Sequence, residues 1–352
     1  MRMKRESAIG AESLVAQYVA VICDLDGVVY RGATPVPGAV ETLNRLSAQD
    51  IPVVFATNNA SRSPDAVVAH LHELGVGPDG WTVVTSSQAA AAYLAARLPE
   101  QTVVLAVGGP GVVQALTDVG LVPVRASELA GATVAAVVQG LGVDVTWTEL
   151  AEVGYHAEAG ATWVVTNLDI MLPTSRGRAP GNGALVAAVQ AATTVIPHVV
   201  GKPGPNLFDL ARSTMGTEKA DTLVCGDRLD TDIEGANAAG LDSLLVLTGA
   251  SDLKDLAFAA PSARPTYVTT ALSGLLEPGV RLRATPEDGV SGRSLRSVVT
   301  ATWAALDAGQ TVPEDTGMWR RLERQLGLER TRPTSSSPCI RSNDPGGRGT
   351  IR

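Results

Sequence analysis

The stretch that decides the fold is Val19-Ala-Val-Ile-Cys-Asp-Leu-Asp-Gly-Val28. The apolar residues 19–23 have the length and the β-branched content of a buried strand. Two acids, Asp24 and Asp26, follow at the end of this strand, and Gly27 permits a sharp turn. Ligands of open parallel sheets bind at the carboxyl ends of the strands, so this acidic strand end marks the edge where function is expected.

Outward from this stretch, short β-branched runs alternate with amphipathic segments rich in Ala and Leu. Ser63-Pro64-Asp65 opens one predicted helix with an N-cap, a proline in the first turn and an acid. The alternation implies right-handed crossovers and an α/β fold, a doubly wound parallel sheet with helices on both faces. The strands are too many for one sheet, which favours two α/β domains. They are predicted at 19–23, 52–56, 82–85, 103–107, 134–138, 162–166, 198–200, 222–225, 243–247 and 266–268.

Composition excludes several classes of protein. The chain has 352 residues, of which 45% are apolar and 18% charged, as in an ordinary globular protein. No apolar run reaches the roughly 20 residues of a membrane span, and no secretory signal follows the charged N-terminus, so we expect no membrane partner and a cytoplasmic location. The net charge of −8 argues against nucleic acid as the main partner. Three scattered cysteines form neither a disulfide framework nor a zinc site.

A second loop with polar side chains at a strand end is Thr57-Asn58-Asn59, directly after the strand predicted at 52–56. It offers a hydroxyl, two amides and backbone N–H groups that lead into a helix, a combination that suits a phosphate group. Taken alone, the same residues could simply form a capped turn.

Two further loops follow strands in the second half of the chain. Lys202 comes just after the short strand at 198–200, where its ammonium could neutralise a phosphoryl oxygen, although a surface lysine is the default reading. Asp227 is the first acid after the strand at 222–225, which makes it the better metal ligand of that loop. Asp232 starts the next helix, so a capping role competes with a functional one. Oxygen-only ligation favours Mg²⁺.

Together the four loops bring carboxylates, a hydroxyl and an ammonium to one rim of the sheet. This set is suited to phosphoryl transfer, which needs a hard cation, a phosphate cradle, and a nucleophile with a proton donor. Neither the dinucleotide-binding pattern G-x-G-x-x-G nor the Walker pattern occurs in the required strand-to-helix context.

These loops resemble, in order and in strand context, the four signature motifs of the haloacid dehalogenase (HAD) superfamily of hydrolases. The segments DLDGVVYRG (24–32), TNNAS (57–61), GKP (201–203) and GDRLDTDI (226–233) match them. The longer strings TNLD (166–169) and PGNGALV (180–186) are similar to the NagD-like, or p-nitrophenylphosphatase, subclass. Within that subclass the chain is most similar to the glycerol 3-phosphate phosphatases of actinobacteria.

The resemblance implies a division of the chain. Residues 15–80 and 198–276 would form the two parts of a HAD core, with an inserted α/β cap domain at 81–197. A small C-terminal segment at 277–330 would follow, and the Ser-, Pro- and Arg-rich residues 331–352 are expected to be a disordered tail.

The resemblance also implies roles for the motif residues. Asp24 would be the nucleophile that forms an aspartyl-phosphate, and Asp26 the general acid and base. Mg²⁺ would be held by Asp24, the backbone carbonyl of Asp26 and Asp227. Lys202 would hold phosphoryl oxygens, assisted by the second motif (Thr57, the backbone of Asn58, and Asn59), and Asp232 would orient the metal's waters or Lys202.

Cap residues are expected to choose the substrate. Asn167, Asp169 and the turn that contains Asn182 are predicted to face the cleft, where they would pair with the hydroxyls of glycerol 3-phosphate. The alternatives are 2-phosphoglycolate, a nucleoside monophosphate or a sugar phosphate, and, more distantly, a catalytically inactive phosphate sensor. We expect a small phosphate monoester as the partner and consider a homodimer possible.

Overall fold

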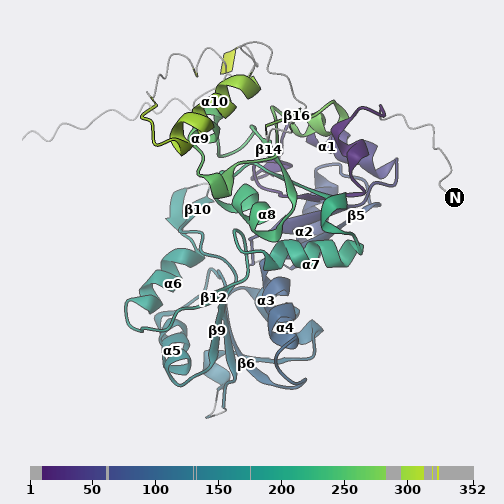
Figure 1. The fold of residues 1–352 in the computed structure, drawn as a ribbon. Coiled ribbons are helices and arrows are strands. Elements are labelled where there is room, and N and C mark those ends of the chain that lie inside the picture. The colour runs from purple at the N-terminus through teal and green to yellow at the C-terminus, as the bar shows by residue number, and fades with distance from the viewer. Residues whose placement is uncertain are drawn as a thin grey trace, which may run out of the picture.

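The computed structural model describes residues 10–60, 63–129, 131, 133–174, 176–282, 295–312, 319 and 323–324. These residues form two parts, each built on its own sheet, with one above the other in Figure 1. The prediction of two α/β units is therefore confirmed.

The larger sheet has seven strands, all parallel except the last edge strand. The chain starts in the middle, builds outward to one edge, and later returns to fill the other side. The strand order thus reverses beside the first strand, which is where an open α/β sheet binds its ligand. In spatial order the strands are β16 (Val280–Arg281), β15 (Tyr267–Thr269), β14 (Asp242–Val246), β13 (Thr222–Gly226), β1 (Ala20–Cys23), β4 (Val53–Thr57) and β5 (Trp81–Thr85).

Helices cover both faces of this sheet because its strands are apolar on both sides. Val21 and Cys23 of β1 pack with the residues of α1 (Ala39–Ser47) and α2 (Pro64–Glu73). Ile22, between them, faces the opposite core, with α7 (Asn206–Met215) and α8 (Glu234–Ala239). The α2 helix begins as predicted, with the Ser63 hydroxyl accepting a hydrogen bond from the Ala66 N–H.

The second sheet is fully parallel and has five strands. The helices α3 (Ser86–Ala95) and α4 (Pro110–Asp118) pack on one of its faces, and α5 (Trp147–Glu158) and α6 (Asn182–Gln190) on the other. A hairpin of β10 (Met171–Thr174) and β11 (Gly177–Pro180) stands apart from it, and so does the β2–β3 hairpin of the core (Tyr30–Arg31 and Thr34–Pro35). In spatial order the five strands are β12 (His198–Val199), β9 (Thr162–Val165), β8 (Ala136–Gln139), β6 (Val103–Val107) and β7 (Val122–Val124).

The sheet pairing corrects both predicted ends of the cap. Strand β5 was expected to open the cap, but it pairs with β4 over five residues and belongs to the core sheet. Strand β12 was expected to reopen the core, but it pairs with β9 of the cap. We propose that the cap runs from the end of α3 to β12, because α3 contacts both α4 and α7 and so bridges the two parts.

The described part of the C-terminal segment packs onto the core rather than standing alone. Helix α10 (Leu295–Asp307) lies against α9 (Leu253–Ala257), and Trp303 donates its indole N–H to the carbonyl of Leu256 at 3.0 Å. Much of the predicted segment at 277–330 falls outside the described residues, and the predicted tail at 331–352 falls wholly outside them. Within the described residues, no helix is both long and apolar enough to cross a bilayer.

Candidate active site

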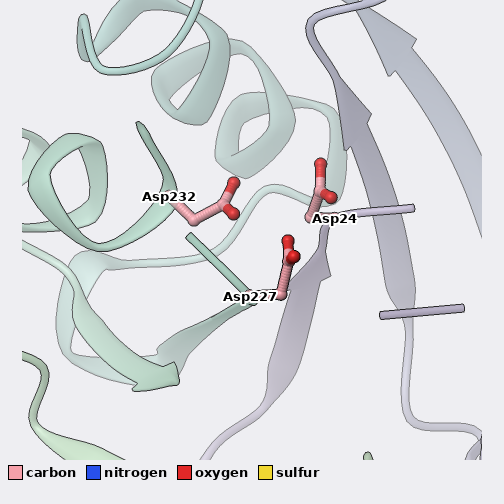
Figure 2. Close-up of side chains that lie close together, drawn as sticks. All are labelled: Asp24, Asp227 and Asp232. Carbon is pink, nitrogen blue, oxygen red and sulfur yellow. The ribbon is translucent and has the colours of Figure 1, made fainter. Parts of the chain in front are cut away.

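The carboxyl ends of three adjacent core strands carry the predicted motif residues. Asp24 follows β1, Thr57 is the last residue of β4, and Asp227 follows β13. Asp232 lies in a π-helical turn, Leu229–Ile233, that leads into α8. A carboxylate oxygen from each of Asp24, Asp227 and Asp232 lies within 4.8 Å of the others, and Figure 2 shows the three groups around a common space.

Lys202 is the cation of this cluster. Its ammonium donates to Asp24 Oδ1 and, at 2.7 Å, to Asp232 Oδ1, while its side chain is only 3% exposed. Burial opposes the charge of Lys202, but Asp232 and Asp24 outweigh it and raise its pKa. Burial also raises the pKa of Asp24, an effect that Lys202 opposes and that Asp232 and Asp227 reinforce. One ammonium therefore faces three acids, which leaves an excess of negative charge.

Asp227 shows that the cluster is built for a further cation. Its Oδ2 accepts the Ala250 N–H at 2.6 Å, but its buried Oδ1 has no hydrogen-bond partner among the described residues. A Cβ at Gly27 would lie 2.3 Å from Asp227 Oδ2, and one at Gly249 only 1.7 Å, so two glycines leave room for this carboxylate. Burial, with help from Asp232, raises the pKa of Asp227 to about 7. A hard divalent cation would satisfy the unpaired oxygen and the excess charge, so the residues fit Mg²⁺.

Asp26 lies at the open side of the same loop. It is exposed, in contrast to buried Leu25, and Gly27 after it adopts φ +86°, a conformation that favours glycine. The Gly27 carbonyl accepts the Thr248 hydroxyl at 2.7 Å, which ties this turn to the loop after β14. Asp26 is thus an exposed residue on the same short loop as Asp24 of the cluster.

The second motif has two kinds of residue. Thr57 is 6% exposed, and its hydroxyl accepts the Asn59 N–H at 3.1 Å, which shapes the turn. The Asn58 carboxamide turns toward Lys202 and bonds both the N–H and the carbonyl of that residue. The Asn58 side chain therefore holds the lysine loop, and the Thr57 hydroxyl and the backbone are the groups of this segment that would remain for a phosphate.

The three predicted cap residues differ in position. Asp169 is half-buried, and its Oδ2 lies 3.4 Å from Asn58 Nδ2, at the junction of cap and core. Burial raises the pKa of Asp169, while Arg228 and Lys202 oppose the rise. Asn167 is 4% exposed and donates to the Asn58 carbonyl at 2.7 Å.

Asn182 corrects the sequence prediction. It is 1% exposed, and its Nδ2 donates to the carbonyl of Asn167 at 2.8 Å, so this donor is committed inside the cap, while its Oδ1 is buried without a hydrogen-bond partner among the described residues. It is the first residue of α6, and the start of this helix lies against the loop after β9, where the Gly183 N–H donates to the Asp169 carbonyl at 2.9 Å. Asp169 is therefore the least buried of the three, and its carboxylate lies beside Asn58.

Sequence reasoning missed two features. The segment Thr248–Ser251 supports the metal cluster, with the Ala250 N–H on Asp227 and the Ser251 hydroxyl accepting the Leu229 N–H at 3.1 Å. The sequence could have indicated this segment, because it is a turn with Gly and Ser directly after the strand predicted at 243–247. The four motif loops likewise follow predicted strands. The second feature is Arg228. It bonds Asp230 through two N–H groups at 3.0 and 2.7 Å, and its positive charge opposes the rise in the pKa of Asp169.

The fold and this cluster define a HAD-like hydrolase, and comparison with known proteins shows that the chain belongs to that family. The haloacid dehalogenase-like hydrolase family model matches residues 21–122, and a second HAD-hydrolase-like model matches residues 199–275. The chain is 45% identical to the D-glycerol 3-phosphate phosphatase of Mycobacterium tuberculosis over 278 residues, which are 79% of this chain and 76% of the relative.

Solved structures agree with this assignment. A crystal structure of a glycerol phosphate phosphatase from Mycobacterium tuberculosis in complex with magnesium matches with a TM-score of 0.78 at 39% identity, over 90% of this chain and 99% of that one. A 4-nitrophenylphosphatase from Thermotoga maritima matches with a TM-score of 0.67 at 29% identity, over 75% of this chain and 98% of that one. The predicted superfamily and subclass are confirmed.

Proposed function

We propose that the protein is a Mg²⁺-dependent phosphatase that hydrolyses glycerol 3-phosphate to glycerol and phosphate. The observation that carries the chemistry is the cluster of Asp24, Asp227 and Asp232 around the buried Lys202 ammonium. The similarity to glycerol phosphate phosphatases supports the choice of substrate.

In the proposed reaction an Asp24 oxygen attacks phosphorus, and the bond from phosphorus to the ester oxygen breaks. Asp26 gives its proton to the departing alkoxide, which leaves as glycerol. Water then attacks the phosphorus of the aspartyl-phosphate and loses a proton to Asp26, while the bond to Asp24 breaks and phosphate leaves. Asp26 ends protonated and Asp24 ionised, so both return to their starting states.

Other residues of the cluster supply charge and position. Lys202 and the Thr57 hydroxyl hold the phosphoryl oxygens, with the lysine offsetting charge that builds up during transfer. Asp232 fixes the ammonium of Lys202 at 2.7 Å, and its Oδ2 accepts the Arg228 N–H at 3.2 Å. Mg²⁺, held by Asp24, the Asp26 carbonyl and Asp227, would neutralise phosphoryl oxygens and reduce repulsion between them and the nucleophile.

The position of Asp169 favours substrates whose leaving group carries hydroxyls over substrates whose leaving group is negatively charged. Its carboxylate stands beside Asn58 at the mouth of the phosphate site. A carboxylate accepts hydrogen bonds from hydroxyls of glycerol, but it would repel the carboxylate of 2-phosphoglycolate. The same argument leaves sugar phosphates as competitors, since they also present hydroxyls.

A screen of phosphate monoesters tests the proposal. With Mg²⁺ we expect glycerol 3-phosphate to give the highest kcat/KM among glycerol 3-phosphate, 2-phosphoglycolate, nucleoside monophosphates and sugar phosphates. Asp24→Asn should abolish turnover while the fold stays intact by circular dichroism. Turnover by this variant within tenfold of wild type would refute the assignment of Asp24 as the nucleophile. Absence of turnover in wild type, with phosphate still bound, would support the sensor alternative.

Asp169→Asn tests the basis of specificity. Loss of the repulsive charge should narrow the preference for glycerol 3-phosphate over 2-phosphoglycolate by about tenfold, which corresponds to roughly 1.4 kcal/mol. Turnover of p-nitrophenyl phosphate, whose leaving group lacks hydroxyls, serves as the control and should change little. An unchanged preference would remove Asp169 from the specificity site.

We also propose that the enzyme is cytoplasmic, because Cys23 and Cys225 are buried free thiols on paired strands, as suits a reducing compartment. Light scattering coupled to gel filtration would test whether the enzyme forms the homodimer that the sequence leaves open.

A further inference from the structure

The Asn58 side chain is matched to the backbone of the catalytic lysine. Its Oδ1 accepts the Lys202 N–H at 2.8 Å, and its Nδ2 donates to the Lys202 carbonyl at 3.1 Å. A carboxamide has an acceptor oxygen and a donor NH2 group, so it can satisfy both backbone groups at once, whereas a carboxylate can satisfy only the N–H. Lys202 is thus held on its main chain by Asn58 and on its ammonium by Asp24 and Asp232.

Asn58 is in turn held by Asn167 of the cap and by Ser86 at the start of α3. Its carbonyl accepts the Asn167 Nδ2 at 2.7 Å and the Ser86 hydroxyl at 2.8 Å. Asn167 follows β9 of the cap sheet, and its own Oδ1 accepts the Asp169 N–H at 3.2 Å. One buried amide therefore bonds a core turn through its nitrogen and the loop of Asp169 through its oxygen.

Close backbone contact leaves these parts little freedom to move separately. A Cβ at Gly201 would lie 2.1 Å from the carbonyl of Thr166, just before Asn167, and 2.6 Å from Asn58 Oδ1. Gly201 is thus the point at which the lysine loop contacts both the end of β9 and the Asn58 carboxamide. A shift of the end of β9 must be taken up by the loop that carries Lys202.

We propose that Asn167 is a positioning residue that couples the cap to the phosphate site, fixing Lys202 through Asn58 and fixing Asp169 through its backbone N–H. The proposal deepens the phosphatase function, on which it rests. It gives Asn167 a role other than binding the hydroxyls of the substrate, because both ends of its amide are committed within the protein. A substitution of Asn167 should therefore weaken the binding of every phosphoryl ligand, whatever its leaving group.

The test compares Asn167→Ala with wild type on inorganic phosphate, glycerol 3-phosphate and p-nitrophenyl phosphate. Loss of the bond to the Asn58 carbonyl should weaken phosphate inhibition by about tenfold, the effect of one well-placed hydrogen bond. It should also lower kcat/KM by a similar factor on both substrates. Asn167→Asp keeps the acceptor for Asp169 but loses the donor to Asn58, so it should share the loss of phosphate affinity.

Asn237→Ala is the matched control. Asn237 donates its Nδ2 to the carbonyls of Ser262 and Arg264 at 2.7 and 3.1 Å, away from the site. Its removal costs similar hydrogen bonds and should lower thermal stability without changing the phosphate inhibition constant. A purely structural role for Asn167 predicts the same pattern for Asn167→Ala, and that result would overturn the proposal.

A double variant tests the route through Asn58. Since Asn167 and Asn58 act on the same lysine, Asn58→Ala and Asn167→Ala should together cost clearly less than the product of their separate losses. Fully multiplicative losses would refute the shared route. A loss on glycerol 3-phosphate alone, with unchanged phosphate inhibition, would make Asn167 a substrate ligand instead. Failure of the proposed function would look different, because the wild type itself would then turn over neither substrate. In that case calorimetry would still measure the affinity of wild type and of each variant for inorganic phosphate.

Discussion

Asp227→Asn should make the metal-free protein more stable while it removes the response to magnesium. The substitution keeps the shape of the side chain, and the amide oxygen can still accept the Ala250 N–H that Asp227 accepts at 2.6 Å. What it removes is one negative charge from a group of three acids that faces one lysine. Stability and metal binding are therefore expected to change in opposite directions.

The pKa of Asp227 sets the magnitude. Its rise from 3.8 to about 7 means that ionisation opposes folding. Each pKa unit is worth about 1.4 kcal/mol, so the gain from Asp227→Asn has a ceiling of roughly 4 kcal/mol above pH 7. Below a pH of about 4 the carboxyl group is protonated in the folded and unfolded chain alike, and the gain disappears. The advantage of the variant should therefore grow as pH rises from 4 to 7.

The assay is denaturant unfolding in EDTA and in Mg²⁺ at pH 4 and pH 8. Wild type should gain about 2.7 kcal/mol in Mg²⁺ at one hundred times its Kd, and the variant should gain little. Asp230→Asn is the control from the same loop, because the Arg228 guanidinium lowers the pKa of Asp230 and its neutralisation should not stabilise the fold. If Asp227→Asn were no more stable than wild type in EDTA at pH 8, or were equally stabilised by Mg²⁺, the reasoning would be refuted.

Three further outcomes follow from the structure. Asp26→Asn should slow turnover by roughly 10² to 10⁴, measured by phosphate release, because the proton carrier is lost while the cluster remains; a change below threefold would contradict that role. EDTA should abolish activity and Mg²⁺ restore it, whereas Ca²⁺ should inhibit because it takes more ligands and could hold Asp24 away from attack; activity that survives chelation and dialysis would exclude the metal. Trp303→Ala should lower the free energy of unfolding by about 3–5 kcal/mol in denaturant titrations, because its side chain is 6% exposed and bonds Leu256; a loss below 1 kcal/mol would mean that α10 does not support the core.

The motif residues of the core could be predicted because parallel strands end at one edge. Asp24 and Asp227 lie far apart in the chain, yet each follows a short apolar strand, and the two strands pair side by side in the core sheet. Each strand could be recognised from its own apolar run, and the geometry of the sheet then brought the ends together. The same logic would have reached the loop at Ala250, which follows β14.

The boundaries of the cap could not be predicted for a related reason. Apart from the edge strand β16, both sheets are parallel and covered by helices on both faces, so the sequences of β5 and β12 do not show which sheet they join. Which sheet a strand joins depends on its partner across the hydrogen bonds, and a local run of residues carries no record of that partner. The predicted cap therefore gained one strand of the core and lost one of its own.

Asn182 and Asn167 show a different limit, and it has a consequence for any attempt to change the substrate. The Asn-Gly pair at Asn182 suggests an exposed amide, but Asn182 is buried and donates to the carbonyl of Asn167, and Asn167 is buried and donates to the carbonyl of Asn58. The loop that carries Asp169 is thus fastened to Asn58, and Asn58 is fastened to Lys202. A substitution that moves this loop to fit a larger leaving group will also move the lysine, so it should cost affinity for the phosphoryl group as well. Changes at Asp169 that leave the backbone in place should alter specificity at a smaller cost.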